Sequence, residues 1–138
     1  MLFRSRALAQ LKMALTQGLG ATPTQRRALA EECSVAEAAA IHFRSPANQA
    51  RFVMARRAAA SAKTAQDAAP HRASMENVLK DEIALARRLH HIQSRDSRIG
   101  FEASNQYYYV PVDLVEKILN CRDLLERWLP SLGGSARS

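Results

Sequence analysis

The stretch Pro111-Val-Asp-Leu-Val-Glu-Lys-Ile-Leu-Asn-Cys-Arg-Asp-Leu-Leu-Glu-Arg-Trp128 carries the strongest helical pattern in the sequence. Its apolar residues recur at intervals of three and four, which places them on one face of an α-helix. These residues are Leu114, Ile118, Cys121, Leu125 and Trp128. Pro111 suits the first turn, where its missing amide hydrogen costs nothing, and Asp113 suits the positive end of the helix dipole. We therefore expect a helix that begins at Pro111 and ends at Pro130 and the glycines after it.

The segment before this helix has a similar pattern with one exception. Val78, Leu85, Leu89 and Ile92 form an apolar stripe, and Ser74 is the expected N-cap of the helix that carries it. Glu82 falls inside the stripe, where an apolar residue is usual. We expect a buried Glu82 to be paired with a nearby arginine, either Arg88 or Arg98.

The first half of the sequence predicts two more helices. Leu8, Leu11, Leu15 and Leu19 share one helical face, and Gly18, Gly20 and Pro23 end that helix. Thr24 is the expected N-cap of the next, and Pro46 predicts a kink or break near Arg44–Ser45, with the helix restarting at Pro46. Residues 58–73 are rich in alanine and polar residues, and they predict either a weakly held helix or a solvated linker.

Composition supports a helical protein of modest core size. The chain has 138 residues, enough for one domain, and its 47% of hydrophobic residues include much alanine. Glycine and proline number 5 each. We therefore predict an all-α fold, an antiparallel bundle of about four helices with one long polar loop at residues 94–110. Residues 1–130 form a single domain in this prediction, and residues 131–138 form a disordered tail.

The net charge of +7 is concentrated in residues 1–72, which carry 11 Lys and Arg against 4 Asp and Glu. A basic half is compatible with a nucleic-acid partner. Its arginines are scattered with few aromatic residues among them, which favours a solvated face. Cys33 and Cys121 are expected to be buried free thiols. No signal peptide or run of about 18 apolar residues occurs, so we expect no membrane partner and a cytoplasmic location by default.

The polar loop is the most informative candidate for function. It reads Ser94-Arg-Asp-Ser-Arg-Ile-Gly-Phe-Glu-Ala-Ser-Asn-Gln-Tyr-Tyr-Tyr109 and holds all three tyrosines of the protein. Connections within helical bundles usually take about 2–8 residues, so a structureless loop of this length suggests a binding role. Flat aromatic rings, amides, carboxylates and guanidinium groups can recognise a carbohydrate. The candidate ligand-binding residues are Arg95, Arg98, Glu102, Asn105, Gln106, Tyr107 and Tyr108.

Two other interpretations of the loop remain open. A protein-docking surface uses much the same residues, since tyrosine and arginine are enriched at binding hot spots. A structural loop, with Arg95–Asp96 salt links and tyrosines packed on the helices, fits the sequence as well.

Catalytic and metal sites are less favoured by the sequence. Glu82 and Glu102 could be considered as the two carboxylates of a glycosidase, but nothing in the sequence fixes their separation. His90 and His91 are adjacent and point about 100° apart on a helix, so they do not easily share a metal. We expect no catalytic residue, no metal and no cofactor in this chain.

The loop and the helix after it resemble the C-terminal helical region of large bacterial glycoside hydrolases of the hexosaminidase and α-glucuronidase type. The resemblance lies in residues 94–109 and in Pro111–Cys121, and the run from Ser34 to Phe52 fits the same region. In that family pattern a histidine is expected where this chain has Gln106, which puts any proton-transfer or metal role there in doubt. The resemblance implies that Glu102, Asn105, Tyr107 and Tyr108 contact a sugar.

The resemblance also implies what accompanies the chain. The catalytic residues of such enzymes lie in a barrel domain, so we expect this chain to be a truncated gene, a gene fragment or a separate helical subunit. Its function is then that of an accessory helical domain of a carbohydrate-active hydrolase, partnered by carbohydrate or a catalytic barrel and inactive alone. The alternative is a basic helical module that binds a protein or a nucleic acid.

Overall fold

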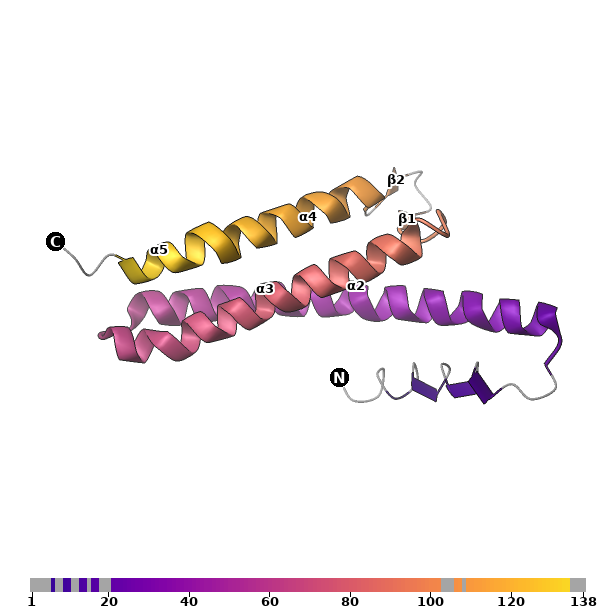
Figure 1. Cartoon of the computed structure of the whole chain (residues 1–138), viewed down its shortest axis with the longest axis horizontal. Helices are drawn as coiled ribbons and strands as arrows, with labels where there is room; N and C mark the ends of the chain where they lie inside the picture. Colours follow the sequence, from indigo (N-terminus) through magenta and orange to yellow (C-terminus); the bar gives the residue numbers. More distant parts are fainter. Residues whose placement is uncertain are drawn as a thin grey trace. The chain divides into compact units, whose positions relative to one another are not determined.

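The computed structural model describes residues 6, 9–10, 13–14, 16–17, 21–102, 106–107 and 109–134, and these are mainly helical. Its elements are α2 (Pro23–Ser61), α3 (Ala65–Gln93), β1 (Phe101–Glu102), β2 (Gln106–Tyr107), α4 (Pro111–Asp123), the π-helical segment η1 (Leu124–Trp128) and α5 (Leu129–Gly134) (Figure 1). The prediction of a helical protein is confirmed. The four leucines of the expected first helix lie outside the described residues.

The chain divides into two compact units, Met1–Phe43 and Arg44–Ser138. In the first unit α2 begins with a capping box. The backbone amide of Thr22 donates to Gln25 Oε1 at 2.9 Å, and the Gln25 amide donates to Thr22 Oγ1 at 3.3 Å. Thr24 is therefore not the N-cap, because Thr22 fills that position and leaves Pro23 in the first turn, where proline is favoured.

The expected break at Pro46 is wrong. Helix α2 runs from Pro23 to Ser61 with Pro46 inside it. A proline in a helix removes one backbone hydrogen bond, but side chains next to it can hold the helix in place. Ser45 and Asn48 both bond to α3, so the turns around Pro46 are fixed from outside the helix. The boundary between the two units falls between Phe43 and Arg44, less than one helical turn before Pro46.

Helix α3 begins earlier than the sequence suggested. Its N-cap is Thr64, whose hydroxyl oxygen accepts a hydrogen bond of 3.0 Å from the Asp67 amide. The expected N-cap, Ser74, lies inside the helix, and the segment 58–73 is helical apart from the short turn at 62–64. A threonine with an acidic residue three positions later is a strong N-terminal signal, and it outweighs Pro70 in the following turn.

The last helix begins at Pro111, as predicted, and the Asp113 carboxylate accepts a 2.8 Å hydrogen bond from the Val110 amide. Its expected end at Pro130 is wrong. The chain widens into the π-turn η1 and continues as α5 through Gly134, with Pro130 inside α5. Such a turn shifts the backbone bonding pattern by one residue, and Leu129 donates to Leu124 O. The first residues of the expected tail, 131–134, are therefore helical.

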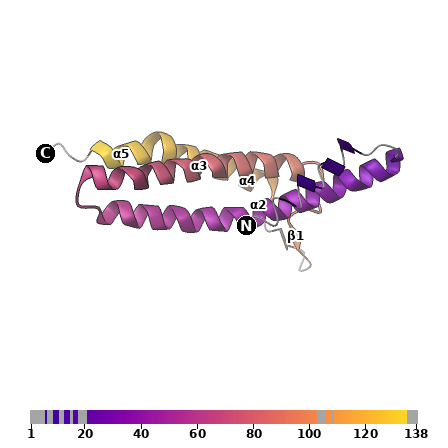
Figure 2. The ribbon, with the colours of Figure 1, turned by 90° about the horizontal axis from the view of Figure 1, so that it is seen from below.

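In the second unit, α4 lies alongside α3 (Figures 1 and 2). The rod of α4, η1 and α5 runs opposite to α3, because Arg72 near the start of α3 bonds to Leu132 O in α5, whereas Glu82, further along α3, pairs with Lys117 in α4. The ring centroids of Phe52 and Trp128 are 5.9 Å apart. The buried residues of this unit include Ala55, Met75, Val78, Leu79, Ala86, Leu89, Ile92, Leu114 and Cys121. Both cysteines of the chain are buried and free, as expected.

Candidate functional site

The segment after α3 begins as a series of tight turns. The amides of Arg95 and Asp96 both donate to Ile92 O, at 3.1 and 3.2 Å, and the Ile99 amide donates to Asp96 O at 3.1 Å. Ile99 is buried. The first third of the expected loop is therefore anchored to the C-terminus of α3.

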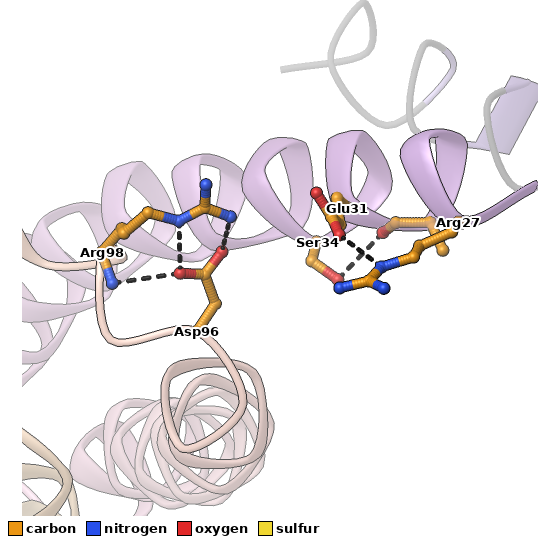
Figure 3. A network of polar contacts seen from close by, with 6 residues as sticks. Arg27, Glu31, Ser34, Asp96 and Arg98 are labelled. Carbon is orange, nitrogen blue, oxygen red and sulfur yellow. Dashed lines mark hydrogen bonds and ion pairs between the residues drawn. The ribbon is translucent and has the colours of Figure 1, made fainter. Parts of the chain in front are cut away.

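Asp96 is held by Arg98 in this turn (Figure 3). Its Oδ1 accepts the Arg98 amide at 3.1 Å and Arg98 Nε at 2.8 Å, and its Oδ2 accepts Arg98 Nη2 at 2.6 Å. These hydrogen bonds and the positive charge of Arg98 lower the pKa of the Asp96 carboxyl to about 2. The structural interpretation of the loop paired Asp96 with Arg95. Arg98 takes that place because its amide and guanidinium reach the same carboxylate across the turn.

A short antiparallel pairing follows. Glu102 is the Cα partner of Gln106, and Phe101 is the partner of Tyr107. Two predicted ligand-binding positions, Glu102 and Gln106, therefore lie directly opposite each other. Arg95 is exposed on the turn before this pairing. The other two predicted positions, Asn105 and Tyr108, lie outside the described residues.

Three residues join the start of the loop to its end, and we call Gln93, Gly100 and Tyr109 the loop base. Gln93 Nε2 donates to Tyr109 O at 3.5 Å. Gly100 has φ +92°, and a Cβ placed on it would lie 2.8 Å from Tyr109 Cε2 and 3.0 Å from Tyr109 O. Only glycine fits this backbone and this contact without strain. Burial raises the pKa of the Tyr109 hydroxyl.

A second polar site lies among α2, α3 and α4, and we call it the Glu82 cluster. Glu82 is 4% exposed. Its Oε1 accepts Asn48 Nδ2 at 2.7 Å, and its Oε2 accepts Ser45 Oγ at 2.9 Å and pairs with Lys117 Nζ at 2.5 Å. The expected pairing of Glu82 with Arg88 or Arg98 is wrong, because α4 brings Lys117 to the carboxylate.

Asn48 connects this carboxylate to a second one. It is 2% exposed, and its Nδ2 also donates to Asp81 Oδ2 at 2.6 Å, while its Oδ1 accepts Arg51 Nη1 at 2.9 Å. Asp81 is bonded in addition by Arg44, through Nε at 2.9 Å and Nη2 at 2.6 Å. Every buried polar atom named here has a partner, which a buried network needs if it is to stabilise the fold.

The geometry of the Glu82 cluster is that of a structural network and not of a nucleophile. In a Ser–Lys catalytic pair, the serine hydroxyl must give its proton to the lysine nitrogen. Here Lys117 Nζ donates to Ser45 Oγ, and Ser45 Oγ donates to Glu82. Both Glu82 oxygens are engaged by donors, which also argues against its use as the general acid or base of a glycosidase.

The sequence interpretation missed most members of the Glu82 cluster. One available signal was Glu82 itself, since a carboxylate inside an apolar stripe requires buried donors. Asn48 lies seven residues from both Ile41 and Ala55, two buried positions on the same helical face. Lys117 lies between the buried residues Leu114 and Cys121. Neither pattern shows which helices face each other, so the pairing of Glu82 with Lys117 and Asn48 could not be predicted without the tertiary structure.

Two kinds of feature are absent from the described residues. Among them, no group of three or more His, Cys, Asp and Glu side chains is arranged to hold a metal ion. The same part of the chain contains no helix that is long and apolar enough to cross a membrane.

Comparison of the chain with protein-family models, with curated proteins and with solved structures gave no match in any of the three.

Proposed function

We propose that the chain is a non-catalytic carbohydrate-binding module, an accessory helical domain of a carbohydrate-active hydrolase, and that its 94–110 loop carries the binding surface. The single observation that carries the proposal is the register of β1 and β2, in which Glu102 is the partner of Gln106 and Phe101 the partner of Tyr107. The register thereby pairs a residue that bears a carboxylate with one that bears an amide, and one aromatic residue with another. This is the chemistry that binds sugar hydroxyls and the apolar faces of sugar rings.

The anchoring of the loop supports this proposal. A binding surface must be held in one shape, because ordering a mobile loop on binding weakens affinity. The turn at Ile92–Ile99 and the loop base hold the two ends of this segment close to α3 and α4. In the same proposal, the helices form an antiparallel bundle of about four, and the bundle is the scaffold that presents the loop.

A glycan titration tests the proposal directly. Chito-oligosaccharides and glucuronic-acid-bearing xylo-oligosaccharides are added to the protein, and amide chemical shifts and tyrosine fluorescence are followed. We expect saturable changes in residues 94–110. Tyr107→Ala and Glu102→Gln are each expected to weaken binding about tenfold, the effect of removing one principal contact.

Two matched controls separate binding from folding. Glu76→Gln removes an exposed carboxylate on α3 that pairs with Lys80, and Phe43→Ala removes a ring that is 56% exposed. Both variants should bind glycans as the wild type does. Equal weakening by the controls and by the loop variants, or no shift at any glycan concentration, would reject carbohydrate binding.

A second candidate function is a basic interaction module, and the adjacent exposed residues Arg56 and Arg57 favour it. Binding of a single-stranded oligonucleotide that weakens steeply with salt, and that is reduced in Arg56→Gln/Arg57→Gln but not in Tyr107→Ala, would support this candidate in place of the first.

A further inference from the structure

The loop base contains a buried polar atom without a partner. Gln93 is 4% exposed. Among the buried side-chain nitrogen and oxygen atoms of the described residues, its Oε1 is the one without a hydrogen bond. Its Nε2 is directed to Tyr109 O at 3.5 Å, which is a long contact for a hydrogen bond. Exchanging the amide nitrogen and oxygen does not resolve this, because it would set two carbonyl oxygens against each other.

An unpaired buried acceptor is costly to the folded state, and native proteins contain few of them. An apolar side chain of similar length at position 93 would avoid the cost. Departures from good local packing of this kind are expected at functional sites, where a group is left ready for a ligand at the expense of stability. Gln93 lies at such a place, since Tyr109, its neighbour, directly follows the tyrosines of the loop.

We propose that Gln93 is a further ligand-binding residue, and that its Oε1 accepts a hydrogen bond from a carbohydrate hydroxyl at the loop base. This inference rests on the proposed carbohydrate function. A buried acceptor discriminates strongly, because an analogue that lacks the donor leaves the acceptor unpaired. Gln93 therefore makes the module selective for a sugar with a hydroxyl at that position.

The experiment compares Gln93→Met and Gln93→Leu with the wild type. Both side chains are apolar and close to glutamine in length or volume, and both remove the unpaired acceptor. The melting temperature is measured without ligand, and the dissociation constant is measured by titration with chito-oligosaccharides and glucuronic-acid-bearing xylo-oligosaccharides. Gln66→Met, which changes an exposed glutamine in the first turns of the same helix, is the control.

We expect Gln93→Met to melt at the wild-type temperature or a few degrees above it, and to bind the glycan about tenfold more weakly. Gln93→Leu should behave alike, and Gln66→Met should match the wild type in both measurements. A lower melting temperature in both Gln93 variants would overturn the inference, since it would show that Gln93 supports the fold. Unchanged glycan affinity would overturn it as well, since water would then be the donor to Oε1.

The two proposals fail in different ways. If the wild-type protein binds none of the glycans, the proposed function fails and the role of Gln93 fails with it. If the wild type binds and the Gln93 variants bind equally well, only the role of Gln93 is rejected.

Discussion

Two buried polar side chains on α3 differ in one respect. Glu82 and Gln93 are each 4% exposed, and their separation of 11 residues, about three helical turns, places them on the same face. Both oxygens of Glu82 are bonded, by Asn48, Ser45 and Lys117. Among the described residues, the Gln93 amide makes one long contact through its nitrogen and no hydrogen bond through its oxygen.

In our proposal, α3 serves two purposes. A fully bonded buried network favours one register among the helices that contribute to it, because any shift leaves a charge without its partner. The Glu82 cluster thus fixes α2, α3 and α4 in the second unit. The loop base is less completely bonded, and in our proposal this end of α3 keeps a free acceptor for a ligand.

The largest effect is expected from breaking the Glu82 cluster. Lys117→Met leaves the Glu82 carboxylate buried without its cation, and we expect a loss of about 3–5 kcal/mol in the free energy of unfolding. Urea denaturation followed by circular dichroism measures it. Lys80→Met is the control, since Lys80 pairs with Glu76 at the surface and such pairs contribute only about 0–1 kcal/mol.

The double variant Glu82→Met/Lys117→Met sharpens this test. Replacing both charges by apolar groups removes the uncompensated carboxylate, so the double variant should be more stable than Lys117→Met alone. If the losses of stability caused by the two substitutions are additive, the broken ion pair is not the reason for the loss in Lys117→Met. The contrast between a paired Glu82 and an unpaired Gln93 would then be rejected for Glu82.

A smaller effect is expected at the loop base. Gly100→Ala places a Cβ 2.8 Å from the Tyr109 ring at a φ of +92°, and we expect a loss of about 1–3 kcal/mol. Gly100→Asn carries the same Cβ but tolerates positive φ better. If Asn is as damaging as Ala, the contact with Tyr109 dominates, and if Asn is clearly milder, the backbone conformation does. Wild-type stability in both variants would contradict the described geometry.

The smallest effect concerns Asp96 and pH. Its folded pKa of about 2 lies below the usual 3.8, so the carboxylate favours the folded state above pH 3.8, and this contribution is lost as the pH falls toward 2. Asp96→Asn should therefore show a shallower loss of stability over that range than the wild type. Urea denaturation at several pH values measures how the free energy of unfolding changes with pH. Parallel curves for the two proteins would show that the Asp96–Arg98 interaction does not cause this change.

The sequence predicted those features that depend on neighbours along the chain. The helical class follows from apolar spacing, the start of α4 follows from Pro111 and Asp113, and the burial of Cys33 and Cys121 follows from their helical positions. Proline was a poor guide. Pro46, Pro70 and Pro130 all lie inside helices, because a single missing backbone hydrogen bond is a local cost that contacts elsewhere can offset.

The candidate site was likewise predictable only in part from the sequence. Its residue types were evident from the run of tyrosines and polar residues at 94–109, but its geometry was not. The pairing of Glu102 with Gln106 and the close approach of Gly100 to Tyr109 join residues on opposite sides of the loop. No periodicity in the sequence encodes such a register. Asp96 and Arg98 were both visible in the sequence, yet their pairing depended on the shape of the turn.

Local forces, which act over a turn or two of helix, let the sequence by itself determine the helical rods, their apolar faces and the place of the polar loop. Only the tertiary structure decided that Lys117 satisfies Glu82 and that Gln93 Oε1 meets no donor among the described residues. The physical reason is that burial and hydrogen-bond satisfaction depend on which residues from distant segments meet. The same buried polar side chain is stabilising or costly according to the donors that the other helices bring to it.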